Sequence, residues 1–144
     1  MLTLRPFGKK DLPLVAQWLY GEHAASWIDS PEDWFAELHD KDSAFTHIMA
    51  EVDGKPMGYC RYGPCGNGFI MGYLIGELEY IPPGYGRVML DRMLALLRAQ
   101  GATAVMVDPD DGKAINTDCR ELLESCYFLW DGGFYTYFLN TTKP

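Results

Sequence analysis

Gly84-Tyr85-Gly86-Arg87 decides the fold, because this glycine-paired turn joins an apolar run over residues 72–80 to an amphipathic helix predicted over residues 87–99. Two glycines allow the backbone to adopt positive φ angles and to approach a ligand closely. The first N–H groups of a helix point outward without an acceptor in the helix, at the positive end of the helix dipole. The turn therefore predicts a seat for an anion such as a pyrophosphate. A strand-to-helix turn also uses glycine for purely conformational reasons, so the residues around the turn must show whether it binds an anion.

The elements after the turn continue an alternation of strands and helices. Four apolar residues at helical spacing predict the buried face of the helix: Leu90, Met93, Leu94 and Leu97. Gly101 is expected to end this helix, and residues 104–107 are expected to form a short buried strand. Strand, helix and strand in this order predict a parallel pair with a right-handed crossover. A last helix over residues 115–126 and two strands over residues 127–130 and 134–139 are expected to complete the chain.

The elements before the turn are predicted from local signals. Residues 2–4 are expected to form a strand, and Asp11 is expected to be the N-cap of the first helix. Ser30-Pro31 indicates the start of a second helix. Asp53-Gly54 predicts a tight turn between antiparallel strands over residues 46–52 and 55–62. Residues 63–68 are rich in glycine and proline and are expected to form a loop, followed by a long strand over residues 69–80.

Composition and charge limit the classes of protein. The 144 residues, 48% hydrophobic and 22% charged, suit one mixed α/β domain over residues 1–144, and no apolar run reaches the length of a membrane span. The first six residues lack the apolar core of a signal peptide, so a cytoplasmic location is expected. The net charge of −8 disfavours nucleic acid and suits a cationic partner such as an amine, or serves solubility alone. The four cysteines and three histidines have no metal-ligand spacing, so no metal is expected.

The order of these motifs resembles the GNAT superfamily of acetyl-CoA-dependent N-acetyltransferases over nearly the whole chain. The segment Leu4-Arg5-Pro6 looks like its first strand, and residues 50–59 look like its central hairpin. Residues 75–86 look like its pyrophosphate motif. Asp108-Pro109 with Asn116 looks like the segment that follows the next strand in small-molecule acetyltransferases, including aminoglycoside 6′-N-acetyltransferases.

The resemblance implies a GNAT-like acyl-CoA N-acyltransferase fold, a central mixed sheet with a splayed strand pair and flanking helices, and it implies acetyl-CoA as co-substrate. Backbone N–H groups of Gly84, Tyr85, Gly86 and Arg87 would then hold the pyrophosphate. The strand around residues 78–80, with Leu78 and Tyr80, would pair with pantetheine. Asn116 would reach the same arm, or would satisfy the start of the last helix.

Two departures from the family pattern bear on catalysis. Ile81, Pro82 and Pro83 replace side chains that commonly contribute to phosphate binding, so the predicted cradle begins at Gly84. Leu123 stands where the family commonly has the tyrosine that acts as general acid, and Tyr127 stands where glycine is common. Cys126, Tyr127 or a water molecule would have to replace that acid, unless none is needed.

Three carboxylates are candidates for the general base that takes a proton from the amine: Glu77, Glu79 and Asp108. If residues 77–79 are strand, the period of two places Glu77 and Glu79 on one face, either toward a cleft or toward solvent. Asp108 alternatively caps the turn before Pro109. The aromatic side chains of Trp27 and Trp34 are candidates for an acceptor pocket or for core packing.

The sequence therefore predicts an N-acetyltransferase that moves acetyl from acetyl-CoA to a primary amine of a small molecule by direct attack in a ternary complex. A catalytically impaired GNAT-fold module that binds CoA or a protein is the alternative, and acylation of a protein amine is a third. No nucleic-acid or membrane partner is expected. The predicted strand over residues 134–139, with Tyr135 and Tyr137 alternating, is suited to pair as an edge strand in a homodimer.

Overall fold

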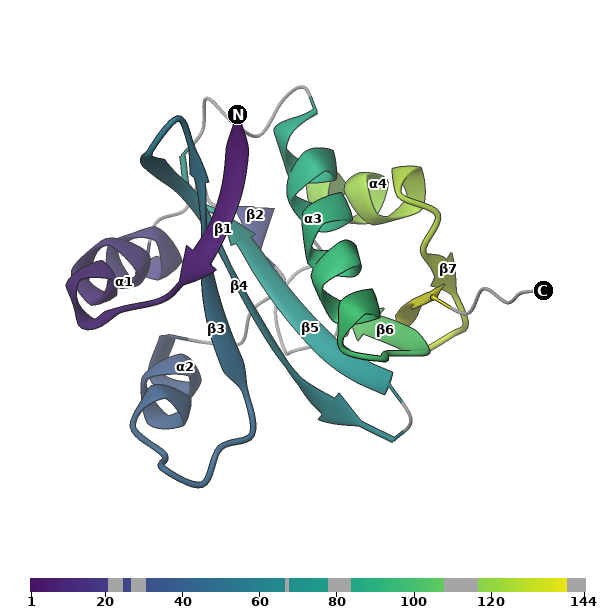
Figure 1. The fold of residues 1–144 in the computed structure, drawn as a ribbon, viewed down its shortest axis with the longest axis horizontal. Helices are drawn as coiled ribbons and strands as arrows, with labels where there is room; N and C mark the ends of the chain where they lie inside the picture. Colours follow the sequence, from purple (N-terminus) through teal and green to yellow (C-terminus); the bar gives the residue numbers. More distant parts are fainter. Residues whose placement is uncertain (21–24, 27–30, 67, 78–83, 108–116, 140–144) are drawn as a thin grey trace.

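A computed structural model of the chain describes residues 1–20, 25–26, 31–66, 68–77, 84–107 and 117–139 (Figure 1). The first half contains β1 (Leu2–Pro6), the 3-10 turn η1 (Lys9–Asp11), α1 (Leu12–Tyr20), β2 (Ala25–Ser26), α2 (Pro31–Leu38), β3 (Thr46–Val52) and β4 (Lys55–Cys65). The second half contains β5 (Gly68–Ile75), α3 (Tyr85–Ala99), β6 (Ala104–Val107), α4 (Thr117–Ser125), β7 (Leu129–Trp130) and β8 (Tyr135–Phe138). None of the helices in these ranges is long and apolar enough to cross a membrane.

All described strands belong to one mixed sheet. Its order is β1-β3-β4-β5-β6-β8-β7, and β2 pairs with β5 off this path. The strands from β1 to β5 are antiparallel to their neighbours, β5 and β6 are parallel, and β6, β8 and β7 are again antiparallel. The parallel pair predicted on the two sides of the glycine turn is therefore confirmed.

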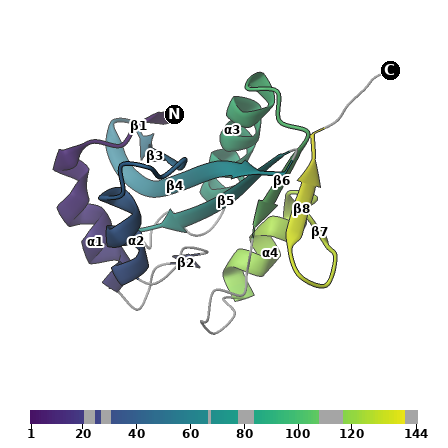
Figure 2. The ribbon, with the colours of Figure 1, turned by 90° about the horizontal axis from the view of Figure 1, so that it is seen from below.

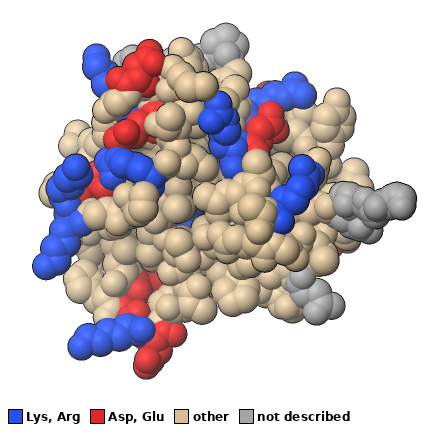
Figure 3. Space-filling view, viewed as in Figure 1, with Lys and Arg blue, Asp and Glu red and all other residues tan. Residues whose placement is uncertain are grey.

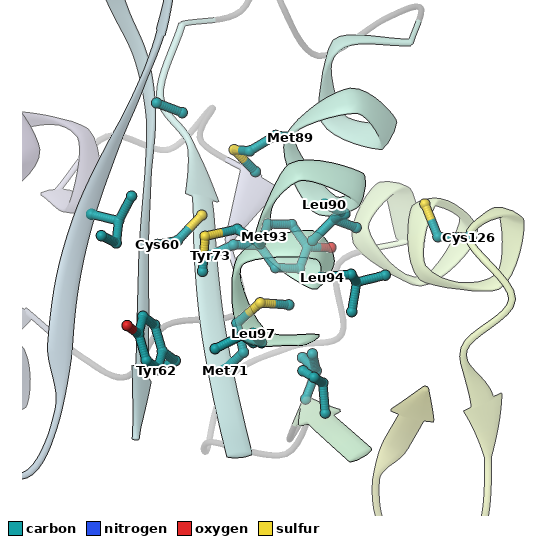
Figure 4. Close-up of a cluster of buried hydrophobic side chains, with 14 of the residues drawn as sticks. Cys60, Tyr62, Met71, Tyr73, Met89, Leu90, Met93, Leu94, Leu97 and Cys126 are labelled. Carbon is teal, nitrogen blue, oxygen red and sulfur yellow. The ribbon is translucent and has the colours of Figure 1, made fainter. Parts of the chain in front are cut away.

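Two apolar clusters cover opposite faces of the sheet. Met49, Tyr59 and Leu74 pack against α1 and α2, whereas the residues that alternate with them face α3 and α4. Figure 2 shows α1 and α2 beside the β3–β4 half of the molecule and α3 and α4 beside the β6–β8 half. In Figure 4, side chains of α3 lie over Tyr73, and Cys126, which directly follows α4, lies farther to the side. The predicted helix face over Leu90 to Leu97 is buried in this second cluster.

The tight turn between β3 and β4 forms where the sequence predicts it. Asp53 and Gly54 both have positive φ angles, of 52° and 85°, which a two-residue hairpin turn of this kind requires. The predicted loop over residues 63–68 is wrong at residues 63–65 and 68, which are strand, whereas Gly66 is a turn residue and residue 67 lies outside the described residues. β4 continues to Cys65 and pairs Pro64 with Phe69 in β5. β3 begins at Thr46, which pairs with Tyr62 of β4. β4 therefore extends past β3 at this end, and Pro64 is tolerated there because β3 offers it no partner.

Three other expectations need correction. Asp11 is not the N-cap of α1 but ends η1, where its carboxylate accepts the N–H of Gly8 at 2.8 Å. The strand expected to run to residue 80 ends at Ile75, and residues 78–80 lie outside the described part of the chain. β8 is not the edge strand, because it lies between β6 and the two-residue strand β7.

Charged side chains are mixed on the face drawn in Figure 3, where Lys and Arg alternate with Asp and Glu around a mostly uncharged centre. The ion pairs of the described residues include Arg5 with Asp11 and Glu51, and Arg61 with Glu37. Opposite charges therefore compensate one another in these pairs, although the whole chain is acidic.

Candidate active site

The parallel strands β5 and β6 separate toward their carboxyl ends. Only two residue pairs join them, Phe69 with Val105 and Ile70 with Met106. Beyond these pairs β5 continues to Ile75. At Leu74 and Ile75, one edge of β5 pairs with β4 and the other edge pairs with the two residues of β2. β2 therefore lies on the same edge of β5 that pairs with β6 nearer the start of the strand. The splayed strand pair implied by the sequence is thus present, and β2 contributes to its opening.

The helix α3 begins beside this opening with a left-handed residue. Gly84 precedes the helix with a φ of 103° and a ψ of −18°, a conformation that residues with a Cβ rarely adopt. The first bond of the helix runs from the Val88 N–H to the Gly84 carbonyl at 3.1 Å. The N–H groups of residues 85–87 therefore precede the hydrogen-bond ladder, as at any helix start. Among the described residues, nothing lies within 4 Å of a Cβ placed at Gly84, so these residues leave the position open.

Gly86 serves packing instead of ligand approach. A Cβ at this position would lie 2.8 Å from Leu122 Cδ2 and 2.9 Å from Ile75 Cδ1. Gly86 is buried, whereas Tyr85 and Arg87 on either side of it are exposed. The second glycine of the turn therefore lets α3 approach β5 and α4 closely, and only the first glycine has the conformation and the open surroundings of an anion cradle.

Glu77 lies just past the end of β5 and is held by a residue of α1. The indole N–H of Trp18 donates to Oε2 of Glu77 at 2.8 Å. Within the described part of the chain, Trp18 is the only residue that hydrogen-bonds this side chain. Residue 77 lies in a bend, so the alternation of strand faces that would tie Glu77 to Glu79 does not apply across this point.

Trp18 is the residue of this site that the sequence analysis missed. Trp18 lies on the buried side of α1 and is 5% exposed. Its contact with Glu77 spans 59 positions of the chain, and no local pattern indicates such a contact.

The other predicted site residues divide into two groups. Trp34 is described and is 1% exposed, with its indole N–H donated to the hydroxyl of Tyr59 at 2.8 Å, so the structure places it in the core beneath α2. Six candidates lie outside the described residues: Trp27, Leu78, Glu79, Tyr80, Asp108 and Asn116. Their roles stay predictions.

The residues considered for the general acid differ in exposure. Leu123 is fully buried and Cys126 is 3% exposed, and burial raises the pKa of the Cys126 thiol. Tyr127 is 72% exposed and has a φ of 70°. This left-handed conformation ends α4, which explains why glycine suits the position. Among the described residues, no group of three or more histidine, cysteine, aspartate or glutamate side chains is placed to hold a metal ion.

Comparison with known proteins supports the fold and the family. Aminoglycoside acetyltransferase AAC(6')-Ib in complex with coenzyme A is similar in structure, with 17% identity, a TM-score of 0.76, and coverage of 96% of this chain and 95% of that one. An aminoglycoside N(6')-acetyltransferase from Legionella pneumophila has 16% identity and a TM-score of 0.76, over 94% of this chain and 89% of its own.

A third similar structure is the ribosomal-protein-S18-alanine N-acetyltransferase from Escherichia coli, with 14% identity, a TM-score of 0.70, and coverage of 99% and 97%. No curated protein sequence matches the chain significantly. The family model for the acetyltransferase (GNAT) family matches residues 12–128. The chain belongs to the acetyltransferase (GNAT) family and is an acetyl-CoA-dependent N-acetyltransferase.

Proposed function

We propose that this enzyme transfers the acetyl group of acetyl-CoA to a primary amine of a small molecule, by direct attack within a ternary complex. The observation that carries the proposal is the open, left-handed Gly84 at the start of α3, beside the diverging ends of β5 and β6. The aminoglycoside acetyltransferase AAC(6')-Ib, solved with coenzyme A and kanamycin, has the same fold with a TM-score of 0.77 at 18% identity. The kanamycin bound in that structure supports a small molecule as the acceptor of the acetyl group.

The described residues fit acetyl-CoA at one end of the site. The N–H groups of Tyr85, Gly86 and Arg87 at the helix start would hold the pyrophosphate, and the exposed Arg87 side chain adds positive charge there. Because β2 already pairs with β5 at Leu74 and Ile75, the pantetheine arm would meet the chain after Ile75. The proposed contacts of Leu78 and Tyr80 with this arm come after Ile75 in the chain, and Asn116 is proposed as a further contact.

Glu77 is the base that we propose first, ahead of Glu79 and Asp108. Its half-buried carboxylate takes a proton from the substrate ammonium, directly or through water, so that a neutral amine attacks the thioester carbonyl. The carbon–nitrogen bond forms, the carbon–sulfur bond breaks, and the departing thiolate takes the second proton of the nitrogen. No acid is required at the fully buried Leu123, since a thiolate is a good leaving group near neutral pH.

Calorimetric titration with acetyl-CoA tests the cofactor half of the proposal, with adenosine as the control ligand. Arg87→Ala should weaken acetyl-CoA binding several-fold, whereas Arg98→Ala, an exposed arginine at the other end of α3, should leave it unchanged. Equal affinities of the two variants would remove the helix start from the site. No binding by the parent protein would favour a protein-interaction module.

Acetylation of an amine panel tests the acceptor half. Aminoglycosides, polyamines and a peptide with an N-terminal alanine are incubated with acetyl-CoA, and the products are identified by mass spectrometry. Acetylated small amines are the expected result. Acetylation of the peptide alone would replace the small-molecule acceptor by a protein amine, and acetyl-CoA binding without any product would favour the catalytically impaired module.

A further inference from the structure

We propose that Trp18 is a positioning residue that orients Glu77 for proton transfer, a role that rests on the proposed function of this site. Trp18 comes from α1, and Glu77 follows β5, so the contact joins two elements that are distant in the chain. The indole nitrogen carries one hydrogen and donates only, so its partner must be an acceptor. The carboxylate is therefore fixed through Oε2, which leaves Oε1 to receive the proton of the amine or of a bridging water.

The backbone at this point is shaped to receive the indole ring. A Cβ at Gly76 would lie 1.8 Å from Trp18 Cδ2, so only glycine permits the ring to lie against the chain next to Glu77. The Gly76 N–H donates to the carbonyl of Met57 in β4 at 2.8 Å, which ties the same segment to the sheet. Residue 76 is thus anchored both to the ring of Trp18 and to β4.

Packing by itself does not account for the contact. Trp18 belongs to the apolar cluster with Val15, Met49 and Leu74, and apolar contacts of this kind need no N–H donor. The hydrogen bond to Glu77 is the part of the arrangement that needs tryptophan. It holds a carboxylate that extends from a bend after the strand, where neither a ladder hydrogen bond nor a helix fixes the side chain.

Trp18 also links α1 to the end of β5. The segment that follows α1 returns at β2 and pairs with Leu74 and Ile75, directly before Gly76 and Glu77. Both contacts brace the end of β5 from one continuous part of the chain. Orientation of Glu77 therefore depends on the seating of α1 against the sheet, and a base held in one geometry accelerates the step by removing unproductive orientations.

Trp18→Phe tests the proposal, because it keeps an aromatic ring against Gly76 and removes the donor. We expect kcat to fall about tenfold with an amine found in the panel, while the KM for acetyl-CoA and the calorimetric affinity stay within twofold. Tyr62→Phe is the matched control, since it removes one core hydroxyl that accepts from Gln100 at 2.8 Å, far from Glu77 in the fold. Its kcat should equal that of the parent.

A spectroscopic measurement tests the contact without turnover. In protein labelled with ¹⁵N-tryptophan, the indole resonance that disappears in Trp18→Phe belongs to Trp18, and Glu77→Gln should shift that resonance more than the other indole resonances. An unshifted resonance would overturn the contact. Unchanged kcat in Trp18→Phe, with loss of turnover in Glu77→Gln, would overturn the positioning role and leave the proposed function standing. Failure of the parent to acetylate any amine would overturn the proposed function, and the positioning role with it.

Discussion

The indole nitrogen of Trp34 lies 2.8 Å from the hydroxyl oxygen of Tyr59, in the core between α2 and β4. Because the indole N–H can only donate, the tyrosine hydroxyl accepts it. The same hydroxyl is hydrogen-bonded to Nδ1 of His47, with the direction set by the tautomer of the imidazole. His47 in turn lies with Nε2 3.7 Å from Glu37, which is paired with Arg61. A chain of polar contacts thus runs through the face of the sheet that α1 and α2 cover.

The protonation of His47 should make stability depend on pH. Burial, with a smaller contribution from Arg61, lowers the pKa of His47 to about 4. The unfolded chain then binds more protons than the folded chain between about pH 6.5 and pH 4. The contribution of neutral His47 to the free energy of unfolding is fully present above this pH window. It is lost as the pH falls through the window, by roughly 1–2 kcal/mol after allowance for solvent screening.

Urea unfolding at pH 7 and pH 4.5 measures this dependence. His47→Asn, whose side-chain amide can accept from the Tyr59 hydroxyl or donate to it, should lose less stability between these two values than the parent does. Equal losses in the two proteins would show that His47 does not carry the dependence.

Tyr59→Phe should destabilise the protein by about 1–3 kcal/mol, because the Trp34 donor would stay buried without its acceptor. The Tyr59 side chain is fully buried, so water does not replace the hydroxyl. The free energy of unfolding in urea measures the loss. Trp34→Phe in the Tyr59→Phe background should cost less than it costs alone, and additive losses would argue against the hydrogen bond.

Asp11→Asn should cost about 1–3 kcal/mol of stability, because the buried carboxylate accepts two hydrogen bonds from Arg5, both at 2.8 Å, and one from Gly8. The hydrogen bond to Arg5 is the main cause that lowers the pKa of Asp11. This contribution is therefore present above about pH 4 and is lost as the pH falls further. Glu51→Gln, at the more exposed side of the same arginine, is the control and should cost less. Thermal unfolding of the two variants makes the comparison.

Gly86→Ala should destabilise the protein by about 1–3 kcal/mol through overpacking against Leu122 and Ile75. Leu122→Ala introduced into Gly86→Ala should recover part of this loss, because it removes the closer of the two side chains. The melting temperatures of the three variants measure the effect. If the loss in the double variant equalled the sum of the losses in the two single variants, overpacking against Leu122 would not be the cause of the destabilisation.

Tyr127→Gly should stabilise the protein by about 1 kcal/mol, because Tyr127 adopts a left-handed conformation at the end of α4. The N–H of Phe128 reaches back to the Leu123 carbonyl at 3.0 Å, as in a glycine-terminated helix. Tyr127→Ala is the matched control, since it removes the exposed ring and keeps the Cβ. A similar gain in both variants would assign the effect to the ring.

Features that depend on neighbouring residues could be predicted from the sequence. The hairpin at Asp53-Gly54, the end of α3 at Gly101 and the strand Ala104–Val107 each follow from turn residues or from apolar runs that lie together in the chain. The loop predicted over residues 63–68 was wrong at residues 63–65 and 68 for the same reason. Glycine and proline indicate a break locally, but pairing along β4 and β5 supplies hydrogen bonds that the local pattern does not contain.

The candidate active site also contains features that could be predicted from the sequence and features that could not. The glycine turn, the helix start and the candidate carboxylate Glu77 could be recognised in the sequence, since each is a residue type at a local position. The separate roles of Gly84 and Gly86 could not, because only the neighbours in space distinguish open surroundings from contact with Leu122.

The sequence by itself determined the order of the elements, the parallel pair around the glycine turn and the family of the chain. Only the tertiary structure decided that Trp18 holds Glu77, that β2 borders the splayed strands and that Trp34 is buried beneath α2. The physical reason is that backbone preferences and turn chemistry act over a few residues, whereas these contacts join positions brought together by packing the two apolar clusters on opposite faces of the sheet.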